Sequence, residues 1–414
     1  MEEKNTSEKS IKAKIFFWVI LVAVVFFGFG YQFGIRNFQA KVANYKPIFS
    51  ISSKDPPAQF EKVDFSPFWQ VWDVMFEKYI DRSKIDPNVL VNGAISGMVK
   101  ALGDPYTAYL TNEENSAVKE DLSGSYEGVG IQLGFKDKQL VVIAPLKSSP
   151  AETAGVLPGD EILKIDGEET IDISLPEAVK KIRGKAGTKV VLNLKRAEKD
   201  AYDLELTRAN IEVKSVVLEY REIDGQKVAI IKLSRFGEQT QSEWDGAVEQ
   251  IQSDGVKAII LDVRNNPGGF LTAAIEIASD FVSGRVVGQE VAGGAREFYP
   301  ATKQARLAKI PTVVLINQGS ASASEIVAGA LQDRGKAKLI GEKSFGKGTI
   351  QDVVDFESGS GVHVTIAKWL LPSGESIDKI GLKPDIEVKI SEEDQTNGKD
   401  PQLDRAQQEI EKII

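Results

Sequence analysis

The spacing of apolar residues changes along this chain, and the changes divide it into segments. Between residues 65 and 102 apolar side chains recur at helical spacing, as in FSPFWQVWDVMFEKYI, which predicts two helices. From about residue 122 to 207 the apolar runs are short, and turn residues such as Pro158-Gly159-Asp160 separate them. The second pattern predicts a compact, β-rich module of ordinary domain size.

Beyond residue 210 apolar strands alternate with helical segments. The runs AIILDVR (258–264) and TVVLIN (312–317) fit strands that are buried on both faces. Apolar residues at helical spacing follow each of them, in 268–284 and 322–337. Such alternation predicts an α/β domain in which helices cover a mostly parallel sheet. The charged stretch 391–414 predicts a loop and a solvated helix.

The longest apolar run lies near the amino terminus. Residues 15–33 begin with IFFWVILVAVVFFGFG, which is uncharged and about as long as a membrane-spanning helix requires. Four lysines precede it, so the positive-inside rule leaves residues 1–14 in the cytoplasm and the remainder outside. A cleaved signal peptide is the alternative, although no small-residue cleavage site follows the run. Residues 34–60, which include Pro56 and Pro57, predict a linker.

The amino-acid composition excludes several kinds of catalytic and metal-binding site. The chain has 414 residues, no cysteine and a single histidine, His363. Thiol peptidases, disulfides, thiolate zinc sites and a two-histidine metalloprotease helix are therefore excluded. A net charge of −9 with no long basic block argues against binding to nucleic acid. A hydrolase with this sequence needs a general base other than imidazole, or it has to use His363.

A serine-rich loop joins the predicted strand 312–317 to the helix that follows. In α/β sheets, loops at the carboxyl ends of the strands hold ligands. Ser322 would lie at the positive end of the helix dipole, and the next amide could donate a hydrogen bond to an oxyanion. Serines at such positions also cap helices, so the loop alone leaves both interpretations open.

A second loop, GEKSFGKGTIQ (341–351), contains a lysine between two glycines. Burial of Lys347 beside apolar groups would lower its pKa, and its neutral amine could then take the proton of a serine. The alternative is an ordinary solvated lysine. The loop nearly matches a phosphate-binding loop, but Gly348 replaces the hydroxyl residue and a strand is predicted to follow, so no nucleotide is expected.

A third loop, DVRNNPGG, ends the predicted strand 258–264 and contains Gly268 and Gly269. The backbone amides of these glycines could complete an oxyanion hole. A tight turn that needs glycine is the other interpretation.

At these residues the chain resembles the carboxyl-terminal processing peptidases, or tail-specific proteases, of serine peptidase family S41. The resemblance covers roughly residues 60 to 390. It implies a mixed α/β peptidase core with a ClpP/crotonase-like sheet, an inserted PDZ domain, and endopeptidase activity near the carboxyl termini of proteins without metal or cofactor. The segments that look like blocks of the family, in the family's order, are GAISGMVKALGDPYTAYL (93–110), DVRNNPGG, SASASEIVAGALQD, GEKSFGKGTIQ and LPSGESIDKIGLKPDI (371–386).

The resemblance also implies roles for single residues. Ser322, the middle serine of its loop, matches the nucleophile, and Lys347, 25 positions later, matches the general base. Gln351, four positions after the lysine, matches the residue that orients the amine. Ala323 and one glycine of the pair Gly268-Gly269 match the oxyanion amides, with Gly268 preferred. Glu325 could tune the site, and helix capping explains it equally well.

The module at 122–207 resembles PDZ domains, which bind a free carboxyl terminus through backbone amides while the peptide adds a strand to a sheet. The resemblance implies that this module covers or frees the active site. Arg183 matches a position that couples peptide binding to activation, and it could equally be a surface cation. The best match to the carboxylate-binding loop consists of Gly128, Val129, Gly130, Ile131, Gln132 and Leu133.

The expected protein is held in the cell membrane by one helix and acts in the periplasm or outside the cell on proteins with free carboxyl termini. A homodimer through 65–102 is plausible by the family resemblance.

Two alternatives stay open: a peptidase that pairs His363 with Asp352 or Asp355, and an inactive PDZ scaffold that binds peptide tails without cutting them. The predicted segments are a cytoplasmic terminus (1–14), a membrane anchor or signal (15–33), a linker (34–60), a helical region (61–121), a PDZ domain (122–207), a catalytic domain (208–390) and a charged tail (391–414).

Overall fold

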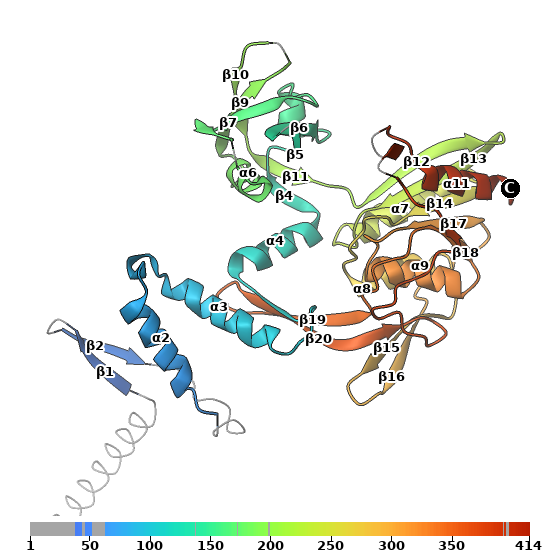
Figure 1. The fold of residues 1–414 in the computed structure, drawn as a ribbon. Coiled ribbons are helices and arrows are strands. Elements are labelled where there is room, and N and C mark those ends of the chain that lie inside the picture. Colours follow the sequence, from blue (N-terminus) through green and yellow to red (C-terminus); the bar gives the residue numbers. More distant parts are fainter. Residues whose placement is uncertain are drawn as a thin grey trace, which may run out of the picture. The chain divides into compact units, whose positions relative to one another are not determined.

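The computed structural model describes residues 38–43, 46–51, 63–136, 138–171, 173–197, 199–391, 393–394 and 397–414 (Figure 1). The chain consists of two units, Met1–Pro87 and Asn88–Ile414. The predicted membrane segment 15–33 lies outside the described residues. Within the part of the chain that the structure describes, no helix is both long enough and apolar enough to cross a bilayer.

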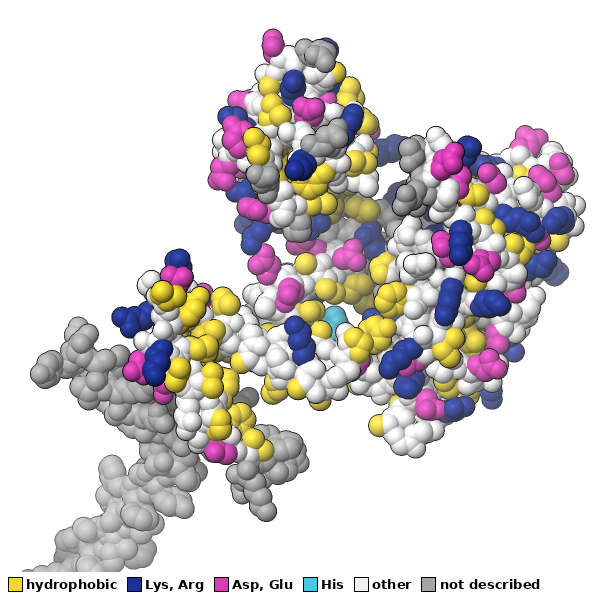
Figure 2. All heavy atoms as spheres, in the orientation of Figure 1, with side chains coloured by type: hydrophobic (Ala, Val, Ile, Leu, Met, Phe, Trp, Pro, Cys, Tyr) yellow, Lys and Arg dark blue, Asp and Glu magenta, His cyan; other side chains and the backbone are white. Residues whose placement is uncertain are grey.

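The first unit contains a hairpin and a helix. Strands β1 (Phe38–Ala43) and β2 (Lys46–Ile51) pair antiparallel, so this part of the predicted linker forms regular structure. Helix α2 (Ser66–Lys78) matches the first predicted helix, and a short 3₁₀ turn, η2 (Arg82–Lys84), follows it. Hydrophobic side chains gather over α2 (Figure 2), which buries none of its residues. Dimerisation through this region stays a prediction.

The β-rich module predicted at 122–207 is present and has a core of its own. Its strands hydrogen-bond in the order β10-β9-β7-β6-β5, with β8 beside β7, and neighbouring strands are antiparallel. In β9 (Lys189–Lys195) the alternate residues Val190, Leu192 and Leu194 are fully buried. The other elements are β5 (Ile131–Lys136), β6 (Gln139–Pro145), α5 (Pro150–Thr153), β7 (Glu161–Ile165), β8 (Glu168–Glu169), α6 (Leu175–Ile182) and β10 (Tyr202–Thr207).

A helix and a pair of strands lead into and out of this module. Helix α4 (Asn112–Ser123) begins at Thr111, whose hydroxyl accepts a hydrogen bond from the first turn, and ends at Gly124 in a left-handed conformation. The antiparallel pair β4 (Ser125–Gly128) and β11 (Ala209–Glu212) then joins the start of the module to its end. Before α4 come α3 (Pro87–Lys100) and the short strand β3 (Ala108–Leu110).

The α/β domain is built on a sheet of six strands in the order β12-β13-β14-β17-β18-β21. β12 and β13 are antiparallel, and every other neighbouring pair is parallel, which confirms the mostly parallel sheet. The two runs predicted as buried strands are β14 (Ala258–Asp262) and β17 (Thr312–Ile316), and all their residues are buried. The remaining strands are β12 (Val216–Ile223), β13 (Gln226–Leu233), β18 (Ala337–Gly341) and β21 (Ile386–Glu387).

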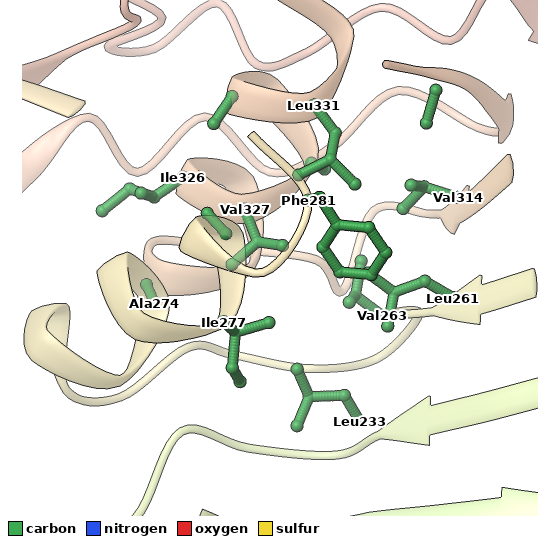
Figure 3. Close-up of a cluster of buried hydrophobic side chains, with 14 of the residues drawn as sticks. Leu233, Leu261, Val263, Ala274, Ile277, Phe281, Val314, Ile326, Val327 and Leu331 are labelled. Atoms are coloured by element: carbon green, nitrogen blue, oxygen red, sulfur yellow. The ribbon is translucent and has the colours of Figure 1, made fainter. Parts of the chain in front are cut away.

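One face of this sheet is covered by α7 (Thr240–Ser253), α8 (Leu271–Ser279) and α9 (Ala323–Asp333). Side chains of α8 and α9, such as Ile277 and Val327, meet Leu261 and its neighbours on the strands (Figure 3). Because side chains alternate along a strand, Ile260, the residue before Leu261, points to the opposite face.

The opposite face is covered by α11 (Pro401–Glu411), which corrects the prediction of a solvated carboxyl-terminal helix. Leu403, Ala406 and Ile410 lie on one side of this helix and are buried. They pack against Ile260 and other apolar residues of β13, β14, β17 and β18. The segment 391–414 therefore closes the core of the α/β domain.

A second sheet has the strand order β16-β15-β20-β19, with β3 paired to β20. The strand predicted to follow Gly348 is β19 (Thr349–Asp355), and its pairing with β20 shifts between Ile350 and Gln351. The other strands are β15 (Arg285–Val291), β16 (Arg296–Pro300) and β20 (Gly361–Leu370).

The burial of α11 predicts a loss of stability on truncating its core-facing side chain. Ile410→Ala should lower the free energy of unfolding by about 2–4 kcal/mol, because it leaves a cavity under the sheet. Ile413→Ala is the control, since Ile413 is 50% exposed and its truncation should change stability by less than about 0.5 kcal/mol. Urea unfolding followed by circular dichroism measures both, and equally small effects would contradict the packing of α11.

Candidate active site

Ser322 lies in the turn between β17 and α9, as predicted from the sequence. It has φ 55° and ψ −116°, a conformation that costs free energy for a residue with a side chain. Its backbone N–H donates to the Glu325 carboxylate at 2.9 Å. Ala323 begins α9, where a backbone N–H has no acceptor within the helix. A strained turn of this kind presents the serine side chain at the carboxyl edge of the sheet.

The structure distinguishes Ser322 from the two serines beside it. Ser320 and Ser324 are fully buried. The Ser320 hydroxyl donates to the carbonyl of Val263 at 2.8 Å, and the Ser324 hydroxyl donates to the carbonyl of Asn266 at 2.8 Å. Ser322 is partly exposed. The flanking serines therefore have structural roles, and Ser322 is the one whose side chain a substrate can reach.

The glycine loop lies directly against Ser322. A Cβ atom added to Gly268 would be 2.8 Å from the Ser322 Cβ and 3.0 Å from the Ala323 amide nitrogen, so no larger residue fits there. Gly269 has φ +136° and packs on the carbonyl of Phe236, where a Cβ would be 2.2 Å from the oxygen. The N–H of Gly268 donates to the side chain of Asn266 at 2.9 Å. That hydrogen bond occupies the backbone amide that the family resemblance favours for an oxyanion hole.

Lys347 follows β18 in the loop 341–348 and is partly buried. Its backbone is held at both ends: the N–H donates to Glu325 at 3.0 Å, and the carbonyl accepts from the Trp369 indole at 2.8 Å. Its amine lies 5.5 Å from the centre of the Tyr106 ring. Burial lowers the pKa of Lys347, while the charges of Asp104 and Glu325 act in the opposite direction.

A buried carboxylate joins the serine loop to the lysine loop. Glu325 is fully buried and accepts four hydrogen bonds: from the N–H of Ser322, from the hydroxyl of Ser344 at 2.5 Å, and from the N–H groups of Gly346 and Lys347. Burial raises the pKa of Glu325, and the hydrogen bonds partly offset this effect. Glu325 therefore caps helix α9, which was one interpretation of its position in the sequence, and it also links the serine loop to the lysine loop.

Gln351 lies on β19, four residues after the lysine, and its amide contacts two threonines. Its Nε2 donates to the hydroxyl of Thr349 at 2.7 Å and to that of Thr365 at 3.4 Å. In the described structure no hydrogen bond joins Gln351 to the amine of Lys347, or that amine to the hydroxyl of Ser322. The backbones of Ser322 and Lys347 meet at Glu325, whereas the three predicted catalytic side chains are not directly bonded to one another.

Comparisons with known proteins give the family. The model of peptidase family S41 matches residues 227–388, that of a PDZ domain 141–196, and that of the activating protease CtpB N-terminal domain 26–114. The carboxy-terminal processing protease CtpA of Bacillus subtilis (strain 168) is 41% identical over 309 residues, which are 74% of this chain and 66% of that protein. CtpB of the same strain is 36% identical over 323 residues, which are 77% and 67%.

The chain belongs to serine peptidase family S41, among the carboxy-terminal processing proteases. It spans about two thirds of the length of these two relatives. A solved structure from Bacteroides fragilis NCTC 9343, described as a candidate S41 protease, shares the fold with a TM-score of 0.54 and 16% identity. That similarity covers 83% of this chain and 97% of the other.

In the PDZ domain of this S41 peptidase, the loop 128–133 runs from the end of β4 into β5. The carbonyl of Val129 accepts from Ala151 at 3.0 Å, and that of Gly130 accepts from Leu146 at 2.8 Å. Gly130 has φ +75°, and a Cβ there would be 2.3 Å from the Ser149 side chain. The predicted carboxylate-binding loop is therefore fixed in shape by the segment before and within α5.

Arg183 ends helix α6 and is bound to groups outside it. Its guanidinium donates to Glu120 of α4 at 3.1 Å and lies 4.3 Å from the centre of the Tyr126 ring of β4. These contacts link the end of α6 to the two elements that precede the PDZ sheet.

His363, the alternative base, lies on β20 opposite Val353 and Ala108. Its Nε2 is buried and has no hydrogen-bond partner. Burial lowers the pKa of His363, and the charge of Lys347 lowers it further. The charge of Asp355 acts in the opposite direction, but its carboxylate is bonded to Asn115 and Lys119, and in the described structure no hydrogen bond joins His363 to Asp352 or Asp355.

Two residues near the lysine were not singled out from the sequence. Asp104 accepts hydrogen bonds from Tyr106 N–H at 3.0 Å and from the Thr107 hydroxyl at 2.6 Å, and its charge acts on Lys347. Tyr106 places its ring beside the lysine amine. Both lie in GDPYTAYL, part of a segment that resembles a family block, and the resemblance does not give roles to its single residues.

Among the described residues, no group of three or more histidine or acidic side chains is arranged to hold a metal ion.

The Glu325 link predicts a strong effect of removing its charge. Glu325→Gln should lower the free energy of unfolding by about 3 kcal/mol. The four donors now share two carboxylate oxygens, whereas the glutamine amide offers them only one acceptor oxygen. Glu375→Gln, at an exposed position of the same domain, is the control and should change stability by less than about 0.5 kcal/mol. Guanidinium unfolding measures both variants, and equal stability of the two would contradict the role given to Glu325.

Proposed function

We propose that this S41 peptidase cleaves proteins near their carboxyl termini, with Ser322 as the nucleophile and Lys347 as the general base. The observation that carries the proposal is the lysine itself: its amine is partly buried over an aromatic ring and its pKa is lowered by burial, on a loop that Glu325 joins to the serine loop. A lysine amine in such surroundings loses its proton more readily and can then accept one from a hydroxyl.

The reaction follows from these groups. The Ser322 oxygen attacks the carbonyl carbon of the substrate while its proton passes to the Lys347 amine, and the peptide C–N bond then breaks as the amine returns that proton to the leaving nitrogen. Water then attacks the acyl-enzyme ester, again with the amine as base, and releases the shortened protein. The N–H groups of Ala323 and of Gly268 or Gly269 stabilise the charge on the substrate oxygen.

Two hydrogen bonds support the proposal that the active site is in a resting state. The Gly268 amide is bonded to Asn266, and the Gln351 amide is bonded to threonines. We propose that activation frees both amides, so that Gln351 orients the Lys347 amine toward Ser322. Binding of a free carboxyl terminus at the loop 128–133 is the proposed trigger, and Arg183, which contacts α4 and β4, is the proposed relay.

We also propose that residues 15–33 hold the peptidase in the membrane with its catalytic part outside the cytoplasm. Their apolar composition and the four preceding lysines support this orientation. Protease added to intact spheroplasts should degrade the catalytic part, and protection of that part until the cells are lysed would contradict the orientation.

The assignment of nucleophile and base is tested by single substitutions. With an unstructured protein substrate, Ser322→Ala and Lys347→Ala should each lower kcat by at least about 10³-fold, because each removes a group that takes part in bond cleavage. His363→Ala should keep most of the activity, since the described structure shows no hydrogen bond between its imidazole and Asp352 or Asp355, and its Nε2 has no partner. Loss of activity in His363→Ala together with activity in Lys347→Ala would favour the histidine mechanism, and equal cleavage by wild type and Ser322→Ala would refute a serine nucleophile.

The lowered pKa of Lys347 predicts a pH dependence with a definite sign. The protonated amine cannot act as a base, so kcat should rise with pH as Lys347 loses its proton. Burial disfavours the charged form, so the midpoint should lie below the ordinary lysine value. Lys343→Ala, at an exposed position of the same loop, is the control and should leave the profile unchanged. A profile that is flat through the alkaline range would contradict lysine as the base.

A further inference from the structure

A largely buried arginine, Arg264, connects the carboxyl-terminal helix to the glycine loop. Arg264 follows β14 and lies four residues before Gly268. Its guanidinium binds Asp262 at 2.9 and 2.7 Å, and it binds both carboxylate oxygens of Asp400 at 2.8 Å. Only 12% of the Arg264 side chain is exposed, and 11% of Asp262, whereas 35% of Asp400 is exposed, so solvent screens the Asp262 half of the double fork less than the Asp400 half.

Asp400 lies at the start of α11 and makes two kinds of contact. One of its oxygens accepts a hydrogen bond from the N–H of Leu403 at 3.0 Å, which caps the helix. The same carboxylate binds Arg264 in a bidentate fork. The neighbouring Gln402 donates to the carbonyl of Val388 and accepts from Arg264 at 3.1 Å, which fixes the helix end against the sheet.

From Arg264 the contacts continue to the serine loop. The N–H of Asn265 donates to the side chain of Asn317 at 2.9 Å, and the Asn317 amide donates back to the Asn265 side chain at 2.8 Å. Asn317 also accepts from the N–H of Gly319 at 3.0 Å. Gly319 packs so closely on Asn265 that a Cβ would be 2.8 Å from the Asn265 Cα. The two loops that meet at Ser322 are thus held at the same edge of the sheet, next to Arg264.

We infer that Asp400 is a positioning residue of the active site, which holds the loop of Gly268 and Gly269 beside Ser322 through Arg264. The inference rests on the proposed function of these residues. It concerns a helix outside the range 227–388 that the S41 model matches. Burial raises the pKa of Asp400, but its hydrogen bonds, with that from Arg264 foremost, outweigh burial and hold the pKa below its usual value.

The effect of Asp400 on the rate would come from the position of the oxyanion amides. The amides that stabilise an oxyanion must lie within hydrogen-bond distance of a single oxygen position, and a misplacement of about 1 Å can cost about 100-fold in rate. With the Asp400 fork removed, Arg264 retains Asp262, which lies on the same segment of chain, and a single hydrogen bond to Gln402 of α11. The loop 264–269 would then be held beside α9 mainly by its own contacts with the serine loop, such as Asn265 with Asn317 and Asn266 with Ser324, and we expect it to shift more easily.

The test separates this role from helix capping. Asp400→Asn keeps a side-chain oxygen for the cap but removes the charge and one acceptor oxygen from the fork. Asp404→Asn, an exposed acidic residue in the first turn of the same helix, is the matched control. The full chain is assayed for kcat and KM with an unstructured protein substrate, and hydrogen–deuterium exchange is measured for peptides that cover 264–270.

The expected result is a fall of at least about tenfold in kcat with KM within twofold for Asp400→Asn, together with faster exchange at 264–270. Asp404→Asn should match the wild type in both, and Asp400→Glu should recover part of the lost kcat. A folded Asp400→Asn with wild-type kcat and exchange would overturn the inference, as would an equal loss in Asp404→Asn. If Asp400→Asn does not fold, Asp400→Ser is the second capping variant, and failure of both to fold would assign Asp400 to stability instead.

Failure of the proposed function gives a different result. If wild type and Ser322→Ala cleave the substrate equally, the catalytic assignment is wrong, whereas the exchange at 264–270 still reports on the link between Asp400 and Arg264.

Discussion

The buried carboxylate of Glu325 is the contact on which the arrangement of the serine loop and the lysine loop depends. It accepts hydrogen bonds from the serine loop and from the lysine loop, which follow the neighbouring strands β17 and β18 of the sheet. A buried charge without partners would be costly, and four donors make this one tolerable. Because the same carboxylate binds the backbones of Ser322 and Lys347, a movement of either loop strains the other.

The surroundings of Lys347 show opposing effects on its charge. Burial favours the neutral amine, and the carboxylates of Asp104 and Glu325 favour the ammonium ion. The Asp104 carboxylate is itself held by Thr107, whose hydroxyl also accepts from the N–H of Thr365 on β20. The electrostatic setting of the lysine is therefore tied to the second sheet as well as to α9, and we expect rearrangement of that sheet to alter the basicity of the amine.

Much of the fold could be predicted from the sequence because its signals are local. The strands β14 and β17 consist of apolar residues buried on both faces, and the helices after them follow from spacing alone. Helix α11 was misjudged because its many charges conceal an apolar stripe at Leu403, Ala406 and Ile410. Spacing shows such a stripe, but not whether a sheet is present to cover it.

The site could be predicted only in part, since its geometry comes from distant contacts. The loop alone did not separate Ser322 from its neighbours: Ser320 and Ser324 are identified as structural by bonds to Val263 and Asn266, 57 and 58 positions away. Nothing local relates Asp104 to Lys347 or Asp400 to Arg264. The family resemblance supplied the catalytic assignments, and the structure adds the links through Glu325 and Arg264.

The proposed mechanism depends on a Lys347 amine whose pKa is lowered by burial, so that it can serve as the base for Ser322. Its pKa can be measured directly by NMR titration of the lysine Cε signals in ¹³C-labelled Ser322→Ala protein, with Lys347→Arg to assign the resonance. The account predicts a titration clearly below that of the exposed lysines. A Lys347 signal that titrates together with the exposed lysines, both in the free protein and with a peptide bound, would contradict it.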